Sequence, residues 1–229
     1  MAGVDLMVVT PHPDDAEFGI AGTVARLVRE GKTVVYVVCT SGEKGTGDRA
    51  VKPQELAKRR EQEQAAAAIL GVREVVFLRY EDQGLEDSAP FRKEIVRCIR
   101  TFRPHTVATT DPYRRYIWHR DHRITGRVVL DAVFPYARDH LSYPDLLEAG
   151  LEPHKVRELL FWGTDEPNYR VDITATFALK LQALRCHESQ VGGHRFAAVE
   201  EWVRERARAA AAGVDFELGE MFHREEIRW

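Results

Sequence analysis

Residues 33–40 read TVVYVVCT, and this stretch decides the fold. It is rich in β-branched residues and shows almost no alternation of polar with apolar side chains. A strand with one solvated face alternates, whereas a strand buried on both faces of a parallel sheet carries a nearly unbroken apolar run. The sequence therefore predicts that residues 33–40 form an interior strand of a parallel sheet.

Similar short runs lie on both sides of this stretch and alternate with helical patterns. Further strands are predicted at residues 4–10, 74–78, 105–110, 158–163 and 170–173. Helices are predicted at residues 17–30, 53–70, 88–102 and 121–138, with more helix in the last third of the chain. Ser88 is expected to cap the third of these helices, and Pro135 to bend or end the fourth. This order predicts a three-layer, Rossmann-like α/β fold with a mainly parallel sheet and helices on both faces.

Composition and charge restrict the class of protein. The chain has 229 residues, of which 44% are hydrophobic, and its net charge is -3. These values suit one soluble α/β domain over residues 1–229, with the helix-rich last third packed on it. The chain has no strongly basic stretch of the kind that binds nucleic acid. Three distant cysteines, no signal-peptide pattern and no membrane-length apolar run indicate a cytoplasmic protein without a membrane anchor.

The first cluster of chemically active residues, Pro11-His12-Pro13-Asp14-Asp15, directly follows the predicted strand at residues 4–10. Adjacent carboxylates repel each other, and a divalent cation would remove the cost of burying both. His12 and Asp15 can bind one metal ion, which leaves Asp14 between them as a general base. The alternative is that Asp14 or Asp15 only caps the following helix.

The second cluster, His119-Arg120-Asp121-His122, comes after the predicted strand at residues 105–110. Ligands of open α/β sheets bind beyond the carboxyl ends of the strands, so the two clusters are expected to converge there. His122 can complete a site of two histidines and one carboxylate, which is a ligand set of catalytic zinc. His119, held by Asp121, can stabilise an oxyanion or protonate a leaving group. The alternative is that both histidines are surface residues at a helix start.

Together the two clusters resemble the motifs of the PIG-L/LmbE-like zinc deacetylases, and the resemblance extends to the segment Glu220-Met221-Phe222. It implies a hydrolase that removes an acetyl or other acyl group from the nitrogen of an amino-sugar substrate, such as an N-acetylglucosamine derivative. It also implies a homo-oligomer such as a hexamer, and zinc, or another divalent ion, as cofactor. The roles that it implies are those given above: metal ligands His12, Asp15 and His122, base Asp14, and oxyanion stabiliser or acid His119, oriented by Asp121.

The same resemblance suggests three substrate-binding residues, Arg59, Asp82 and His187. Their structural alternatives are a solvated helix charge, a turn residue and a core or helix-end histidine. A first departure concerns the family pattern Arg-x-x-Glu: counted from Arg59, Gln62 stands where the glutamate is expected, and Glu63 comes one position late.

A second departure is Ile117, where some members carry a tyrosine; Tyr116 lies next to it. A tyrosine role at the oxyanion is therefore not implied. The segments 136–152 and 192–194 are expected to shape the substrate pocket.

Two other functions are compatible with parts of the pattern. A two-metal phosphoesterase would need more carboxylates to bridge its ions, and Asp111 is the only obvious extra one. A sugar- or metal-binding module without catalysis would have no reason to place the unligated Asp14 beside a metal. The number of bound ions distinguishes the phosphoesterase from a deacetylase with one zinc ion. Acetate release distinguishes the binding module from an enzyme.

Overall fold

The chain forms one mixed sheet in the computed structural model, which describes residues 3–229. Within those residues the sheet has seven strands in the order β3-β2-β1-β4-β5-β7-β6. The strands are β1 Leu6–Thr10, β2 Val34–Thr40, β3 Glu74–Tyr80, β4 Thr106–Thr110, β5 Glu158–Trp162, β6 Tyr169–Asp172 and β7 Gly219–Glu226. The first five are parallel, and β7 pairs antiparallel with both β5 and β6. The predicted mainly parallel sheet is confirmed.

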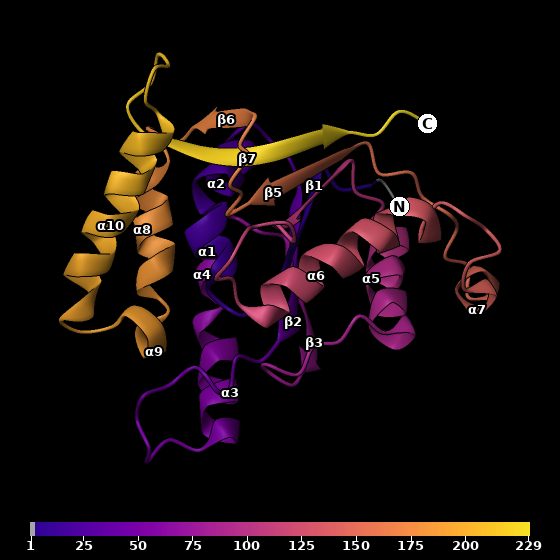
Figure 1. Cartoon of the computed structure of the whole chain (residues 1–229), viewed down its shortest axis with the longest axis horizontal. Helices are drawn as coiled ribbons and strands as arrows, with labels where there is room; N and C mark the ends of the chain where they lie inside the picture. Colours follow the sequence, from indigo (N-terminus) through magenta and orange to yellow (C-terminus); the bar gives the residue numbers. More distant parts are fainter. Residues whose placement is uncertain (1–2) are drawn as a thin grey trace.

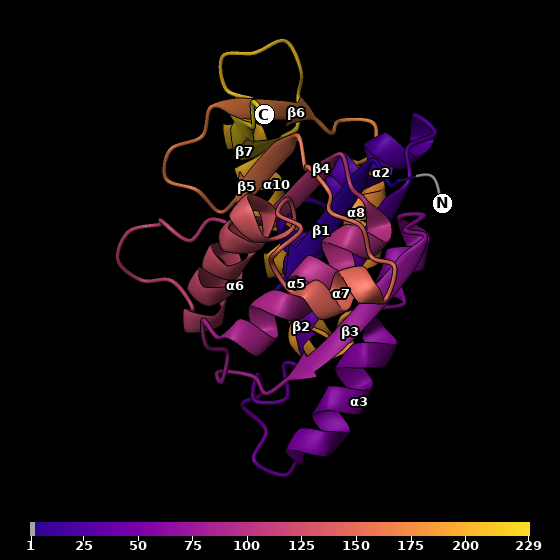
Figure 2. The ribbon, with the colours of Figure 1, turned by 90° about the vertical axis from the view of Figure 1, so that its right-hand side faces the viewer.

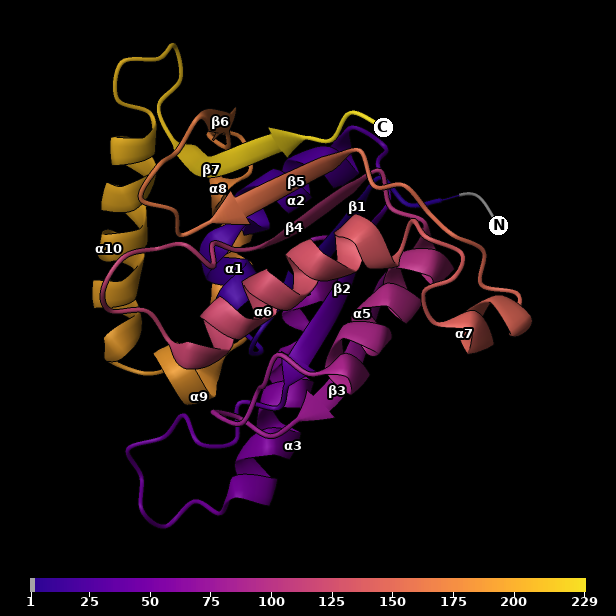
Figure 3. The same ribbon diagram turned by 45° about the vertical axis from the view of Figure 1, so that its right-hand side comes forward.

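Helices cover both faces of the sheet, as the three-layer prediction requires (Figure 1). One face carries α1 Asp15–Gly19, α2 Ala21–Arg29, α4 Ala66–Ile69, α8 Phe177–Arg185 and α10 Arg195–Ala210. The other carries α5 Ala89–Phe102, α6 Arg120–Asp131, the π-helical turn η1 Ala132–Tyr136 and α7 Pro144–Glu148. The remaining helices are α3 Pro53–Glu63 and α9 Glu188–Val191. Figure 3 shows α5 and α6 on the near side of the strands and α8 and α10 on the other side.

The unbroken apolar strands supply side chains to two hydrophobic cores. Leu6 and Val8 of β1 pack in the core beneath α2 and α8, whereas Met7 and Val9 pack in the core beneath α5 and α6. All residues of β2 are buried. Because successive side chains of a strand point to opposite faces, burial on both faces removes the polar alternation. The interpretation of residues 33–40 as an interior strand is therefore correct.

Two predicted helices are each divided in the structure. The segment predicted at residues 17–30 is split at Ile20, whose backbone leaves the helical region with φ -142°. The second part, α2, has its own buried acceptor: the Glu220 carboxylate accepts hydrogen bonds from the backbone N–H groups of Gly22 and Thr23, at 3.0 and 2.8 Å. The segment at residues 53–70 is likewise split into α3 and α4.

Other features of the secondary structure follow the sequence more closely. Ser88 accepts a hydrogen bond from the Phe91 N–H at the start of α5, which confirms the cap. The helix that contains Pro135 loses regular geometry at Phe134, as expected. Strand β7 was not predicted. None of the helices between residues 3 and 229 combines the length and the apolar character that a bilayer crossing requires.

The strand order reverses direction between β1 and β4. From β1 the chain moves outward through β2 and β3, and later through β4 and β5 on the other side. Such a reversal opens a crevice at the carboxyl ends of the two central strands. In Figure 2 this end of the sheet points toward the bottom of the view, where the loop after β2 lies, and α6 lies at the left. The two clusters of reactive residues follow β1 and β4.

Candidate active site and metal centre

Three side chains from the two clusters meet at this crevice. Nδ1 of His12 lies 2.9 Å from Oδ2 of Asp15, and Nε2 of His122 lies 3.2 Å from the same oxygen. The two imidazole rings are 5.3 Å apart between centroids. With metal–ligand bonds of about 2.0–2.2 Å, tetrahedral geometry puts neighbouring ligand atoms roughly 3.3 Å apart. The two distances from Asp15 to the imidazoles therefore match those between neighbouring ligand atoms of one ion.

The far side of the His12 ring faces two more carboxylates. Its Nε2 lies 3.1 Å from Oδ1 of Asp82 and 3.3 Å from Oδ2 of Asp121. Burial lowers the pKa of His12, but contacts with Asp121, Asp15 and Asp82 outweigh it and hold that pKa well above its usual value. A metal-binding histidine commonly presents its second nitrogen to a carboxylate, which fixes the ring and makes it a better ligand. Asp82 and Asp121 occupy this place.

Asp14 adopts a backbone conformation that is rare for a residue with a side chain. Its φ is 101°, and strain of this kind concentrates at functional sites. Asp14 precedes α1, yet its side chain makes no capping hydrogen bond. Asp15 accepts instead from the His12 backbone N–H, at 3.0 Å. Neither carboxylate thus serves as the helix cap of the alternative interpretation.

A buried arginine holds the Asp14 carboxylate. Nη2 of Arg60 lies 2.9 Å from Oδ1 of Asp14, and the same guanidinium donates to the backbone carbonyls of Pro13 and Gly42. Burial raises the pKa of Asp14 to about 6, although Arg60 acts in the opposite direction. Burial would also raise the pKa of Asp15, but His122 and His12 hold it well below its usual range. The two adjacent carboxylates therefore differ in basicity, as a metal ligand and a proton acceptor must.

His119 stands at the N-terminus of α6 and faces His12, with ring centroids 4.7 Å apart. Its Nδ1 accepts a hydrogen bond from the backbone N–H of Asp121, at 3.1 Å. The expected contact of the His119 ring with the Asp121 carboxylate is not formed, because that carboxylate accepts from the Gln83 N–H at 2.7 Å and faces His12. The proton of His119 is thus on Nε2, and the ring is a neutral hydrogen-bond donor. His119 is an exposed residue at a helix start, as its alternative interpretation had it, and it lies at the site as well.

The crevice gathers more potential ligand atoms than one ion needs. Within residues 3–229, two overlapping groups have ligand atoms close enough for one ion: His12 with His119 and His122, and His12 with Asp82, His119 and Asp121. Oδ1 of Asp121 and Nδ1 of His122 are buried and lack a hydrogen-bond partner in the described part of the chain. This concentration of carboxylates, imidazoles and unpartnered atoms fits a divalent cation.

The three expected substrate-binding residues have different positions. Arg59 is exposed on α3, away from Asp14. Its buried neighbour Arg60 contacts Asp14, so Arg60 is the arginine at the site, and a substrate contact of Arg59 stays a prediction. With Arg60 in that role, Glu63 completes the pattern Arg-x-x-Glu, and its carboxylate accepts from the N–H and hydroxyl of Ser189. The sequence shows two adjacent arginines, either of which could face the site. Only the rotation of the helix decides which of them does.

Asp82 and His187 lie deeper than expected. Asp82 is 3% exposed, its carboxylate accepts from the Lys44 N–H, and its contact with His12 helps to lower its pKa to about 2 in spite of burial. His187 is 0% exposed, with Nε2 3.2 Å from the buried Glu17 carboxylate. This placement of His187 is a correction, because a ring without exposed surface does not line a pocket. Asp82 contacts a proposed metal ligand instead of standing free in the crevice.

Substitution of the two arginines tests this correction. We expect Arg60→Gln to destabilise the protein by about 3–5 kcal/mol, because it leaves the buried Asp14 carboxylate without its partner. Arg59→Gln, an exposed change on the same helix, should stay within about 0.5 kcal/mol. Urea unfolding followed by circular dichroism measures both. Equal stabilities of the two variants would show that Arg60 does not hold Asp14.

Comparisons with known proteins identify the family and the fold of the chain. Residues 7–133 match the family described as PIG-L: GlcNAc-PI de-N-acetylase. The diacetylchitobiose deacetylase of Thermococcus kodakarensis is 41% identical over 186 residues, which is 81% of this chain and 69% of that protein. The structure of the N,N'-diacetylchitobiose deacetylase of Pyrococcus horikoshii superposes with a TM-score of 0.92 at 32% identity, covering 97% of this chain and 84% of that one.

A third similarity concerns the fold alone. The 4-carboxy-2-hydroxymuconate hydratase GalB of Pseudomonas putida superposes with a TM-score of 0.80 over 99% of this chain and 98% of that one, at 19% identity. An architecture of this kind can carry other reactions, so function has to be argued from the site.

Proposed function

Because the chain belongs to the PIG-L family, we propose that it hydrolyses the N-acetyl group of a small amino-sugar substrate with one zinc ion held by His12, Asp15 and His122. The single observation that carries the proposal is the contact of both imidazoles with one oxygen of Asp15, at 2.9 and 3.2 Å. Asp14 stands beside these residues, buried and paired with Arg60.

The proposed ligand set is favoured over the group that contains His119 because of the contacts that each ligand atom already makes. Asp15 brings a negative charge into contact with both other ligands, whereas Nδ1 of His119 already accepts a hydrogen bond. A divalent ion at this position supplies Lewis acidity: it lowers the pKa of water and polarises the amide carbonyl. Zinc suits two nitrogens and one carboxylate oxygen, although the choice of metal in a cell also depends on supply.

Asp14 is the proton acceptor of the proposed reaction. Its carboxylate takes a proton from water as the water oxygen attacks the carbonyl carbon, and the N–H groups of Arg60 hold the carboxylate in place. The same proton then passes to the departing amide nitrogen as the C–N bond breaks, which releases acetate and the free amine. We assign this transfer to Asp14, since His119 has only the proton on Nε2 to offer.

His119 stabilises the negative charge that develops on the carbonyl oxygen. Its Nε2–H is free to donate because Nδ1 is held by the Asp121 N–H. A hydrogen bond that is oriented before the reaction stabilises the tetrahedral oxyanion without reorganisation of the site.

Removal of the His119 imidazole is therefore expected to slow the chemical step. We predict that His119→Ala lowers kcat by about 10²–10³, the cost of one oxyanion donor. Bound zinc should stay near one ion per chain, because His119 is not among the proposed ligands. Kinetics and metal analysis of the same preparation check both parts. Loss of the metal together with activity would instead assign His119 to the ligand set.

For the substrate class we propose N-acetylglucosamine glycosides, with N,N'-diacetylchitobiose as the first to test. The two relatives compared above are diacetylchitobiose deacetylases, at 41% and 32% identity. The experiment measures acetate and new primary amine from diacetylchitobiose and N-acetylglucosamine, with and without a chelator. Release that stops with the chelator and returns with zinc supports the proposal. Silence across a broad panel of N-acyl sugars, with metal bound, would favour a binding module instead.

A metal count addresses the remaining alternative. A two-metal phosphoesterase would hold two ions, whereas we propose one. Asp111, the extra carboxylate that such a site would need, accepts a hydrogen bond from the Tyr113 N–H at 2.7 Å and closes a turn. Phosphatase activity with two equivalents of metal would overturn the assignment.

We further propose that the protein is a cytoplasmic homo-oligomer such as a hexamer. The loop before His119 supports assembly, because Tyr113, Tyr116 and Ile117 are 71%, 94% and 92% exposed. Large apolar groups exposed on one loop favour a partner surface. The cysteines, among them the buried Cys39 and Cys98, are free thiols, which suits a reducing compartment. Analytical ultracentrifugation measures the assembly, and a monomer at micromolar concentration would contradict it.

A further inference from the structure

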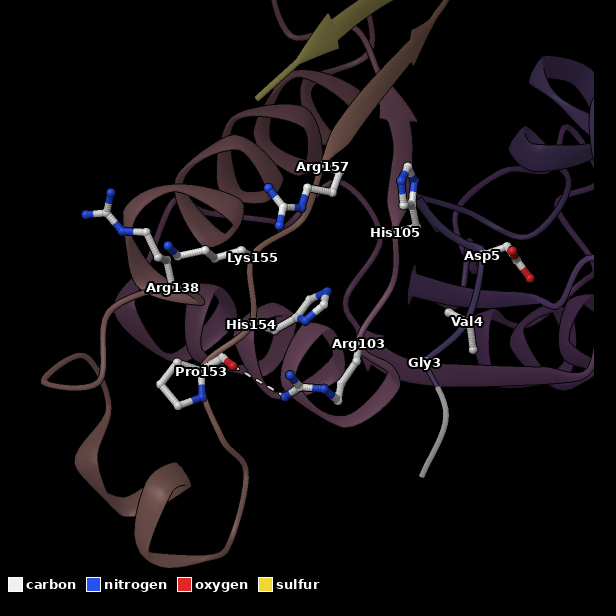
Figure 4. A pocket seen from close by; sticks show the side chains of 10 residues that line it. All are labelled: Gly3, Val4, Asp5, Arg103, His105, Arg138, Pro153, His154, Lys155 and Arg157. Atoms are coloured by element: carbon white, nitrogen blue, oxygen red, sulfur yellow. Dashed lines mark hydrogen bonds between the residues drawn. The ribbon is translucent and has the colours of Figure 1, made fainter. Parts of the chain in front are cut away.

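A basic pocket lies at the edge of the sheet opposite to the active site. Its volume is about 660 Å³, and it is lined by the segments that lead into β1, β4 and β5 (Figure 4). The catalytic residues follow the carboxyl ends of β1 and β4, whereas this pocket surrounds the amino ends. A strand of five residues such as β1 spans roughly 16 Å. The pocket is therefore a separate site, and the proposed reaction makes no use of it.

Positive charge dominates the pocket. Arg103, Arg138, Lys155 and Arg157 line it together with two histidines, and Asp5 is the one acidic residue among its described lining residues. The Asp5 carboxylate is engaged elsewhere: it lies 3.1 Å from Nζ of Lys32 and accepts from the Thr33 N–H at 2.8 Å. Figure 4 shows this carboxylate turned away from the basic side chains.

Three of the four cations have no counter-ion in the described part of the chain. Within residues 3–229, no carboxylate lies within 4.0 Å of Arg103, Lys155 or Arg157, whereas Arg138 pairs with Asp139 at 2.6 Å. Two backbone carbonyls, of Glu152 and Pro153, hold Arg103 in place, and the second contact is visible in Figure 4. Like charges that line one pocket from separate segments repel one another, so an anion in the pocket would be stabilised by the unpaired ones.

His154 lies among these cations and leaves their excess charge uncompensated. Its ring lies 2.7 Å from the Pro104 carbonyl oxygen through Nε2, which makes Nε2 the donor. Burial lowers the pKa of His154 and outweighs the bond to Pro104, which acts in the opposite direction, while the nearby charges of Arg103, Arg157 and His105 lower it further. The neutral ring neither adds to the positive charge nor opposes it.

We propose that this pocket binds a phosphate dianion, either free or as the monoester of a larger molecule. Guanidinium groups offer paired N–H donors that match phosphate oxygens, and an ammonium group adds a compact charge. Arg157 and Lys155 come from the segment before β5 and Arg103 from the segment before β4, so a bound phosphate would contact two parts of the chain. The carbonyl contacts of Arg103 and His154 hold part of the pocket wall before any ligand arrives.

The test uses the full-length, metal-loaded protein and reads the ring signals of His154 by NMR. Sodium phosphate is titrated against sodium chloride at equal ionic strength, and glucose 6-phosphate is titrated in parallel. We expect saturable shifts with phosphate and not with chloride. A tighter response to glucose 6-phosphate identifies a phosphate ester as the ligand, and an equal response identifies the inorganic anion.

Matched variants give the decisive comparison. Arg157→Gln removes one pocket cation, and Arg97→Gln removes one exposed cation of α5 outside the pocket. Loss of a charge-assisted contact of about 1.4 kcal/mol corresponds to tenfold weaker binding, so we expect about a tenfold rise in the phosphate Kd for Arg157→Gln. The Kd of Arg97→Gln should be unchanged. Equal phosphate affinity of both variants, or shifts that chloride reproduces, would overturn the proposal. Deacetylation is not needed for either result, so failure of the proposed function would leave this test intact.

Discussion

Asp14→Asn should abolish nearly all deacetylation while the metal stays bound. An amide has almost the same shape as the carboxylate and can still accept a hydrogen bond from Arg60, but it cannot take a proton from water. General-base catalysis typically contributes a factor of about 10²–10⁴ to the rate, and we expect kcat to decrease by a factor in that range. The measurement is acetate release per zinc-loaded chain, with zinc determined on the same sample.

The matched control is Asp111→Asn, another buried aspartate at the end of a central strand. Its carboxylate closes a turn by accepting from the Tyr113 N–H, and an asparagine oxygen can accept the same bond. We expect activity within about twofold of the parent, as for a change that leaves the turn intact. Full activity in Asp14→Asn would remove Asp14 as the base. Loss of activity in Asp111→Asn would point to a second metal.

The second large effect concerns the metal itself. Asp15→Ala removes the oxygen that contacts both His12 and His122, so the proposed ligand set loses one member and its only carboxylate. Changes to residues that merely support metal ligands cost about 10–100-fold in affinity, and removal of a ligand should cost more than that. We therefore predict that Asp15→Ala is purified without zinc and without activity.

His119→Ala is the control for this prediction, since it also removes a polar group from the crevice. It should keep its zinc, whereas Asp15→Ala should not. Competition with a chelator of known affinity gives both constants. If Asp15→Ala bound zinc as tightly as the parent while His119→Ala lost it, the ion would be held by the group His12, His119 and His122 instead.

The sequence predicted the parallel part of the sheet because strands buried on both faces have nearly unbroken runs of apolar residues. The β1 and β2 segments are buried along their whole length and are largely apolar, each ending in a buried threonine, and the prolines around His12 end the first strand where the site begins. Convergence of the two clusters followed from topology, since carboxyl ends of parallel strands share an edge. The amino-acid sequence was therefore sufficient to predict that His12, Asp15 and His122 meet.

The missed features depend on contacts between distant residues. Strand β7 has the sequence GEMFHREE, in which charged residues mask the strand pattern, and it is stabilised by pairing between β5 and β6. Its buried Glu220 pairs with Lys180 at 2.6 Å and accepts from the start of α2. No local pattern reveals such a contact.

The same limit explains the errors at the site. Arg59 and Arg60 are chemically identical neighbours, and only the rotation of α3 directs Arg60 toward Asp14. The sequence alone does not show that His187 contacts the buried Glu17, and this contact places it in the interior instead of at a pocket. The Asp121 carboxylate was expected to contact His119, but it faces His12 instead.

The central claim is that one ion is held jointly by His12, Asp15 and His122. A crystal structure of the zinc-loaded protein with anomalous data at the zinc edge tests it most directly. We predict one anomalous peak per chain, within bonding distance of the Asp15 carboxylate and of one nitrogen from each of the two histidines, with Asp14 beside it and unbound. A peak bonded to His119, Asp82 or Asp121 without Asp15, or two peaks per chain, would contradict it.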